Sequence, residues 1–438
     1  MIINSKSTLK TMKEYLFLYR GIFYKRSFEI FTLIILSIIT MQKVQSIKFI
    51  YERFISKHWN KSLNSFYYFL NDKSHSIDNM IRVTAKIGVS LIPKDEIEKT
   101  SIYLLIDDTL QPKFGETFEN RYKLFDHAKH AGSSYMNGHC VVSIAMRIPF
   151  FKGDEIKYIT IPLGYKLYDK TNTKLQLARN LIETVMPELS DVQVIVLCDS
   201  WFTKKPLLEV LDVYDNLKII GALRNDTALF GLKPDPTGKR GRPRVKGERL
   251  DYRDFNFKKV DDFFVATIKC LTNLRTDPVT ITVTTTSITD FSSVRLYLSN
   301  ISTEDLKSKP KHEEKCEEEE EKQNLYDIYK LRWSIEVMFY QQKLFWSFGS
   351  YMVRSKVSIE KYINLIGVAY SAMIILPFIS SAFEDYKFCS PQEVKHVIGE
   401  AIREELFFSN LLKIEQIKKN LTHIPYLCQF KDIEDLVS

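Results

Sequence analysis

Four side chains suited to phosphate and metal chemistry recur along one short segment of the sequence. The spacing Y-x2-R-x3-E-x6-K is formed by Tyr329, Arg332, Glu336 and Lys343. On an α-helix, at about 100° per residue, they fall at roughly 0°, 300°, 340° and 320°, within one narrow stripe. A carboxylate flanked by two cations and a phenol could bind a metal ion and a phosphate. The same spacing also fits a surface Arg–Glu pair, which stabilises a helix by about 0.2–0.5 kcal/mol.

Further carboxylates end two apolar runs of the sequence. Asp107 and Asp108 follow the run 102–106, and Asp199 follows the run 192–198. Carboxylates at the ends of buried strands are poorly solvated and repel one another, so a shared edge favours a divalent cation. A few carboxylate ligands suit Mg²⁺ or Mn²⁺, which keep positions open for water and phosphate. An aspartate at a strand end can equally be a simple exit residue.

The elements that must position these carboxylates follow an α/β order. Strand-like runs cover 101–109, 139–148 and 155–168. Helical spacing then covers 174–189, and a continuous apolar strand runs over 192–200. Three strands, a helix and a buried strand predict an α/β core with a mixed sheet.

The segments on either side of this core differ in character. Residues 1–90 are typical of short helices in a basic region, which suits either DNA-end binding or a helical cap. Residues 231–250 are rich in Gly, Pro and basic residues and predict a loop, and three strand-like runs follow between 263 and 300. The acidic segment 313–321 then leads into a long helix expected to begin near Gln323.

In this order, the IDDT and VLCDSWF segments, the β-rich block and the Y-x2-R-x3-E-x6-K helix resemble the DDE transposases of bacterial insertion sequences. More closely, they are similar to the group defined by that tyrosine–arginine–glutamate–lysine pattern, over about residues 100–380. The resemblance implies a ribonuclease-H-like α/β mixed-sheet core, interrupted by a β-rich insertion, with an N-terminal helical domain and C-terminal helices. The expected parts are a DNA-binding region at 1–95, the core at 96–230 and 323–385, the insertion at 231–322, and a C-terminal helical region at 386–438.

The resemblance also implies a set of metal ligands. Carried over by position, these are Asp108, Asp199 and Glu336, which would bind two Mg²⁺ or Mn²⁺ ions. Asp108 is chosen because the family places its aspartate directly before Thr or Ser, and Asp107 is the competing assignment. Ser200 departs from the Arg or Gly that follows the second aspartate in many members, which leaves the local geometry there open.

Basic and aromatic residues are the expected contacts to DNA. Tyr329, Arg332 and Lys343 would contact phosphates beside the scissile bond, with the arginine as a planar fork and the lysine as a point charge. Arg224 follows an apolar strand and could reach phosphates, although it could also be a plain surface arginine. Arg240-Gly-Arg242-Pro resembles the core of an AT-hook, which enters narrow minor grooves, and a plain basic loop is the alternative.

Composition narrows the class of protein. The 438 residues carry 62 Lys+Arg and 54 Asp+Glu, a formal charge of +8, with 45% hydrophobic residues, as in globular chains. The six cysteines form no C-x-x-C pair, and His127 and His130 lack a nearby third ligand, so no zinc site or disulfide framework is expected. The apolar stretch 31–41 is short, and 363–383 is diluted by polar residues, so both predict buried helices rather than membrane spans.

These observations together predict a cytoplasmic transposase that acts without a membrane. The resemblance implies that it binds the terminal inverted repeats of its own element and target DNA, as a homodimer in the DNA complex, and cuts and rejoins strands by in-line phosphoryl transfer. The alternatives are another ribonuclease-H-like DNA nuclease and a non-catalytic, domesticated DNA-binding derivative.

Overall fold

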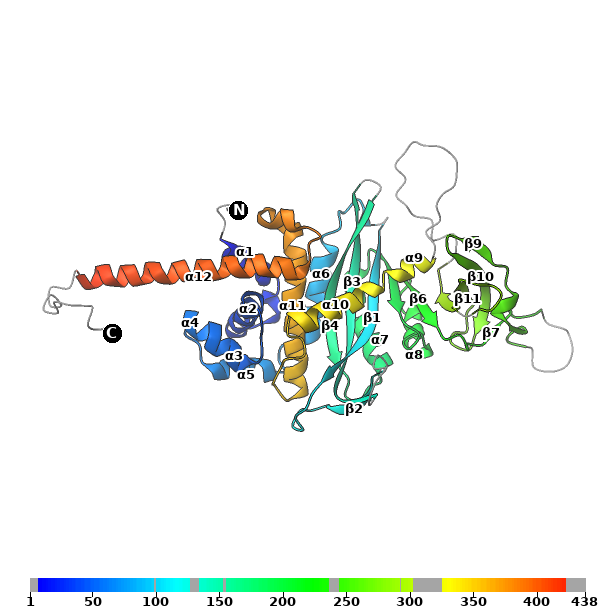
Figure 1. Cartoon of the computed structure of the whole chain (residues 1–438), viewed down its shortest axis with the longest axis horizontal. Helices are drawn as coiled ribbons and strands as arrows, with labels where there is room; N and C mark the ends of the chain where they lie inside the picture. The colour runs from blue at the N-terminus through cyan, green and yellow to red at the C-terminus, as the bar shows by residue number, and fades with distance from the viewer. Residues whose placement is uncertain are drawn as a thin grey trace.

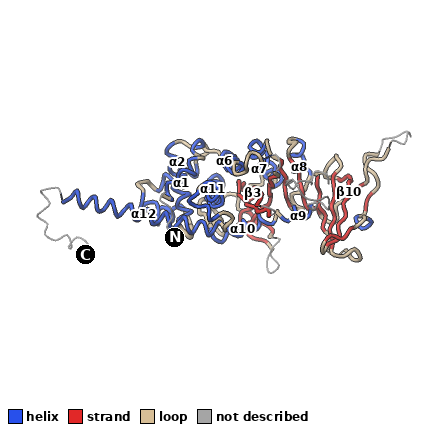
Figure 2. Tube along the Cα trace, turned by 90° about the horizontal axis from the view of Figure 1, so that it is seen from above, coloured by secondary structure: helices blue, strands red, loops and turns tan. Residues whose placement is uncertain are grey.

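The computed structural model describes residues 7–97, 100–126, 134–152, 155–235, 244–291, 293–301 and 325–422. Figure 1 shows an elongated molecule, with helices at one end, a twisted central sheet, and further strands at the other end. Figure 2 shows the same division from above, and the helix α12 projects away from the body in both views. The candidate site residues lie where the sheet meets the helices.

A mixed sheet forms the centre of the molecule. Its first six strands are β1 (Ser101–Pro112), β2 (Tyr122–Phe125), β3 (Tyr135–Lys152), β4 (Glu155–Leu167), β5 (Gln193–Cys198) and β6 (Leu217–Leu223). β1 runs parallel to β5 with Ile106 opposite Cys198, β5 runs parallel to β6, and β3 is antiparallel to β1. The pairing with β5 stops at this pair, but β1 continues to Pro112 beside β3, so the expectation that Asp107 or Asp108 ends its strand is wrong. Asp107, in the middle of β1, and Asp199, just after β5, lie side by side. The predicted mixed α/β core is therefore present.

The later strands continue this sheet. They are β7 (Leu229–Phe230), β8 (Arg249–Leu250), β9 (Lys258–Val260), β10 (Phe263–Thr272), β11 (Val279–Thr285) and β12 (Arg295–Ser299). β12 pairs with β6, with Leu298 opposite Gly221, and the described strands follow the order β2-β3-β1-β5-β6-β12-β11-β10-β7-β8. β4 pairs with β3, and β9 with β10. The expected β-rich block thus shares its hydrogen bonds with the core, and its treatment as a separate insertion stays a prediction.

Helices cover the sheet and form the N-terminal part. In chain order they are α1 (Thr8–Phe17), α2 (Lys25–Thr40), α3 (Ile47–Ile50), α4 (Ser56–His58), α5 (Leu63–Asn71), α6 (Ile77–Val89), α7 (Lys174–Val185), α8 (Lys205–Leu208), α9 (Leu325–Lys330), α10 (Trp333–Phe345), α11 (Lys356–Ile379) and α12 (Pro391–Thr422). A π-helical turn spans Tyr51–Ile55, and 3₁₀ turns span Arg20–Ile22, Met186–Leu189, Glu209–Asp212, Tyr252–Asp254 and Ser381–Tyr386.

The longest apolar helix is part of the core. α11 is long and apolar enough to cross a membrane by length and composition, and 83% of its most apolar window is buried inside the protein. It packs on β4, where a Cβ added at Gly367 would lie 2.7 Å from the ring of Tyr165. The apolar part of α2 is buried as well. The two apolar stretches therefore behave as the expected buried helices.

The first and last helices of the described chain meet. The Glu405 carboxylate of α12 accepts the backbone N–H groups of Thr8 at 2.5 Å and Leu9 at 3.2 Å, and the hydroxyl of Ser7 at 2.5 Å. These amides belong to the first turn of α1, whose N–H groups have no partner inside the helix. A residue from the last helix therefore caps the first helix.

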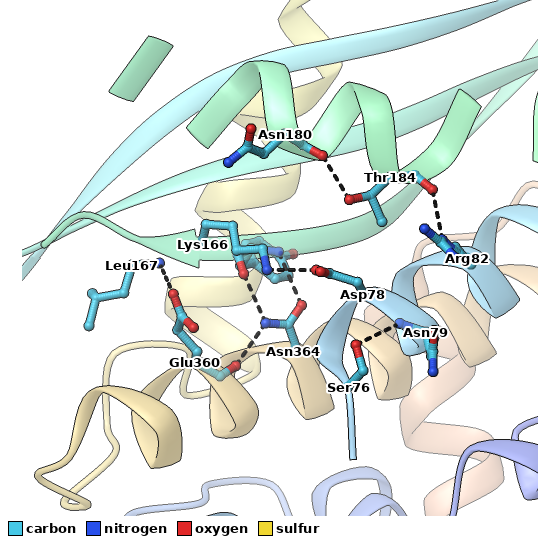
Figure 3. Close-up of polar contacts among 11 residues, drawn as sticks. Ser76, Asp78, Asn79, Arg82, Lys166, Leu167, Asn180, Thr184, Glu360 and Asn364 are labelled. Carbon is cyan, nitrogen blue, oxygen red and sulfur yellow. Dashed lines mark hydrogen bonds and ion pairs between the residues drawn. The ribbon is translucent and has the colours of Figure 1, made fainter. Parts of the chain in front are cut away.

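One side-chain amide joins α11 to β4. Asn364 is buried, accepts the Tyr165 N–H at 3.1 Å, and donates to the carbonyls of Tyr165 at 3.0 Å and Glu360 at 2.8 Å. Figure 3 shows this contact beside the Glu360 carboxylate, which accepts the N–H of Leu167 at 2.8 Å. Both contacts satisfy backbone groups of β4 that would otherwise be buried without partners.

Replacement of Asn364 by Ala should therefore destabilise the fold. We expect Asn364→Ala to lower the free energy of unfolding by about 1–3 kcal/mol, because buried peptide groups of Tyr165 lose their partners. Urea denaturation followed by circular dichroism measures the change. The control is Asn180→Ala, an exposed helical position, which should stay within about 0.5 kcal/mol of the wild type. Equal stability of the two variants would contradict this account of the α11–β4 contact.

Candidate active site

One guanidinium joins a carboxylate of the sheet to a carboxylate of a helix. Arg332 donates from Nη1 to Oδ2 of Asp107 at 2.9 Å and from Nη2 to Oε1 of Glu336 at 2.5 Å. The side chains of Arg332 and Asp107 are only 15% and 17% exposed, and that of Glu336 is 34% exposed. Charge-assisted bonds are strong in such a partly desolvated place, so the contact fixes the start of α10 against the middle of β1.

Asp199 belongs to the same cluster. It follows β5 directly, and its Oδ1 accepts the backbone N–H groups of Trp201 at 3.0 Å and Phe202 at 3.1 Å. The parallel register of β1 and β5 puts it next to Asp107. Arg332 acts electrostatically on both aspartates. A single guanidinium therefore interacts with three carboxylates, those of Asp107, Asp199 and Glu336.

The carboxylates are crowded enough to shift their protonation. Burial raises the pKa of Asp107 to about 7, against the lowering effect of Arg332, and the charges of Asp199 and Asp108 raise it further. Burial also raises the pKa of Asp199, while its backbone hydrogen bonds and Arg332 act in the opposite direction. One cation is thus too few for this group of carboxylates, and more positive charge would be favourable here.

Asp108, the aspartate preferred from the sequence, has different partners. Its Oδ2 accepts from Nζ of Lys174 at 2.9 Å and from Sγ of Cys140 at 3.1 Å. Successive side chains of a strand point to opposite faces, so Asp107 turns towards α10 while Asp108 turns towards the start of α7. The structure therefore brings together Asp107, Asp199 and Glu336, and it places Asp108 in a neighbouring cluster.

The sequence predicts one helix for the four spaced residues, but the structure has two. α9 ends at Lys330 and α10 begins at Trp333, with a tight turn between them. In this turn the N–H of Leu331 bonds to the Ile328 carbonyl and that of Arg332 to the Tyr329 carbonyl, both at 3.0 Å. These bonds span three residues rather than four, so the backbone is wound more tightly than in an α-helix.

The other expected DNA contacts lie in different surroundings. The Tyr329 ring packs 4.7 Å from the ring of Tyr297 on β12, with the Arg332 guanidinium 5.9 Å from its centre. Lys343 is exposed in the last turn of α10. Arg224 follows β6 at the same edge of the sheet as Asp199, and it is exposed and paired with Asp226 at 3.1 Å.

Several expected features lie outside the described residues. They are Arg240, Arg242, the histidines His127 and His130, and the acidic segment 313–321. Conversely, the sequence did not single out Lys174, Cys140 or Trp201. Only the position of Trp201 directly after the Asp199 motif could have drawn attention to it.

The donor chemistry of the cluster fits a hard divalent cation. Asp107, Asp199 and Glu336 supply carboxylate oxygens only, as Mg²⁺ and Mn²⁺ prefer. Within the part of the chain that the structure describes, no three His, Cys, Asp or Glu side chains are already grouped as a metal site. Arg332 instead bonds to Asp107 and Glu336, at oxygens for which a cation would compete.

One protein-family model matches part of the chain. A family model described as DDE superfamily endonuclease matches residues 168–265. The matched range contains α7, β5 and Asp199, and runs into β10. It supports a DDE-type nuclease, a class that typically uses divalent metal ions, and the mixed sheet with its helices is consistent with such a core. No curated protein matches the chain.

The raised pKa of Asp107 predicts a pH-dependent stability. Between its ordinary value of 3.8 and about 7, the folded protein retains a proton that the unfolded chain has lost, so stability falls as pH rises through this window. Asp107→Asn stays uncharged and should therefore gain about 1–3 kcal/mol relative to the wild type between about pH 4 and pH 8. Urea unfolding in metal-free buffer measures this difference. A difference independent of pH, or the same trend in the exposed-site control Asp226→Asn, would refute the assignment.

Proposed function

We propose that this protein is a transposase that binds the terminal inverted repeats of its own element and catalyses metal-dependent cleavage and transfer of DNA strands. The observation that carries the proposal is the cluster of Asp107, Asp199 and Glu336 at one edge of a mixed sheet, with Arg332 between two of them. The DDE endonuclease match supports the nuclease activity. The tyrosine–arginine–glutamate–lysine spacing supports the transposase class.

The proposed metal ligands are Asp107, Asp199 and Glu336. Asp107 takes the place of Asp108 because it faces Arg332 and Glu336, whereas Asp108 is already neutralised by Lys174. Three carboxylates would hold two Mg²⁺ or Mn²⁺ ions. When bound, such ions lower the pKa of the attacking water or 3′-hydroxyl and stabilise the leaving oxygen.

The remaining residues of the pattern would handle the DNA backbone. Arg332 has a planar fork that suits a phosphate as well as it suits carboxylates, so substrate phosphate could draw it away from Asp107 and Glu336. Tyr329 adjoins this fork, and Lys343 extends the same side of α10 with a point charge. Arg224 would add a contact at the neighbouring strand end. These roles place the scissile phosphate beside the carboxylates.

The proposed partners are DNA and a second copy of the chain. Element ends and target DNA would be brought together by a homodimer, in the cytoplasm and without a membrane. Another ribonuclease-H-like nuclease would cut DNA without preference for element ends, and a binding-only derivative would bind such ends without cutting them. The cleavage assay below separates these cases.

Single substitutions test the ligand set. Purified protein is incubated with labelled DNA carrying the element ends, in Mg²⁺ or Mn²⁺. Asp107→Asn, Asp199→Asn and Glu336→Gln should each lower the cleavage rate by at least about 100-fold, because each removes a carboxylate ligand. Asp108→Asn is the matched control for Asp107→Asn and should retain cleavage. If Asp108→Asn abolished cutting while Asp107→Asn retained it, the assignment of the first ligand would be reversed.

Salt dependence tests the phosphate contacts. Arg332→Ala or Lys343→Ala should weaken binding to end DNA and reduce the slope of log affinity against log salt by about 1 for each lost phosphate contact. Fluorescence anisotropy over a salt series measures the slope. Lys387→Ala, which removes a surface lysine paired with Glu384, should leave it unchanged. An unchanged slope in the first two variants would remove both residues from the DNA interface.

A further inference from the structure

We propose that Lys174 is a positioning residue for the active site, a role that rests on the proposed function. It neutralises Asp108 and holds the middle of β1 and the end of β5 together from the face of the sheet opposite Arg332. The carboxylates that face α10 are then only those of Asp107 and Asp199. The proposal follows from what the Lys174 ammonium touches.

The first contact restrains the middle of β1. Lys174 donates to Asp108 at 2.9 Å, with side chains 23% and 17% exposed. The backbone N–H of Asp108 in turn donates to Oδ1 of Asp107 at 2.8 Å. A restraint on Asp108 therefore fixes the peptide group that orients the neighbouring carboxylate.

The second contact restrains the end of β5. The Lys174 ammonium lies 4.8 Å from the centre of the Trp201 ring, a cation–π geometry. The backbone N–H of Trp201 donates to the Asp199 carboxylate at 3.0 Å. The Trp201 ring packs edge-on against the ring of buried Phe202, with 5.0 Å between ring centres. Lys174 thus contacts two residues: Asp108, which is hydrogen-bonded to Asp107, and Trp201, which is hydrogen-bonded to Asp199.

Local structure fixes Lys174 itself. It is the first residue of α7, and the preceding Thr173 forms a capping box with Gln176, in which each side chain accepts the other residue's N–H. The Oγ1 of Thr173 accepts from the Gln176 backbone at 3.2 Å, and the Gln176 amide oxygen accepts from the Thr173 backbone at 2.9 Å. A well-capped helix start holds its first side chain in a defined place.

Charge explains why this contact would affect catalysis. Asp107 and Asp108 lie where β1 passes the end of β5, beside Asp199, and Arg332 contacts only the side that faces α10. Lys174 supplies the compensating cation on the other side. Without it, an uncompensated, mostly buried carboxylate would repel both aspartates of the active site.

The test compares Lys174→Met with three other variants. Lys174→Arg keeps the cation, and Lys174→Met with Asp108→Asn removes the uncompensated carboxylate as well. Lys166→Met is the matched control. Lys166 forms an ion pair with Asp78 at 2.6 Å that joins β4 to α6 rather than β1 to β5 (Figure 3). Each variant is measured for single-turnover cleavage at saturating DNA with Mn²⁺, and for the pH midpoint of Mn²⁺ binding by calorimetry without DNA.

Lys174→Met should slow cleavage by about 10-fold or more, with DNA affinity unchanged. It should also move the midpoint of Mn²⁺ binding to lower pH, because an added negative charge favours a divalent cation more than a proton. Lys174→Arg should stay near the wild type. Asp108→Asn should restore the Mn²⁺ midpoint in the double variant, because the uncompensated carboxylate is then gone. Lys166→Met should change neither.

Three results would overturn the role of Lys174. They are unchanged readouts in Lys174→Met, no recovery in the double variant, and equal shifts in Lys166→Met. The Mn²⁺ midpoint does not depend on DNA cleavage. If the wild type failed to cut DNA while the midpoint still shifted and recovered, the transposase proposal would fail and the positioning role would stand.

Discussion

The repulsion among carboxylates where β1 passes the carboxyl end of β5 is the constraint on which this structure depends. Parallel pairing forces Asp107 and Asp199 to the same edge, and α10 adds Glu336. Isolated buried carboxylates are costly, so the fold supplies a cation on each side of the sheet. Arg332 serves the face towards α10, and Lys174 serves the face towards α7. The arrangement makes a site that strongly favours additional positive charge.

The elements around the site hold α10 in place from three directions. On its buried side, Gln342 accepts the Tyr165 hydroxyl of β4 at 2.8 Å. At its carboxyl end, buried Lys395 of α12 donates to the Phe345 carbonyl at 3.1 Å. This contact is favourable because the carboxyl end of a helix carries a negative partial charge. At its start, the tight turn after α9 sets the position of Arg332. The carboxylate of Glu336 is thus carried by a helix with little freedom to move.

The sequence predicts this site in part, for physical reasons that can be named. The mixed sheet and the glutamate helix are visible because apolar runs and helical spacing extend over many residues. The choice between Asp107 and Asp108 is not visible, because the two have the same chemistry and only strand alternation and distant partners distinguish them. The turn before Arg332 and the pairing of β12 with β6 are tertiary effects with no local signature. Lys174 is an ordinary helix-start lysine until Asp108 and Trp201 are placed around it.

The cap on α1 has a consequence for how the chain folds during synthesis. The carboxylate of Glu405 that satisfies the amides of α1 is made 397 residues after Thr8. At about 5–20 residues per second, some 20–80 s of translation separate the two. During that time α1 has exposed amide donors at its start and no docked α12. Completion of this helical layer therefore has to wait for the synthesis of α12.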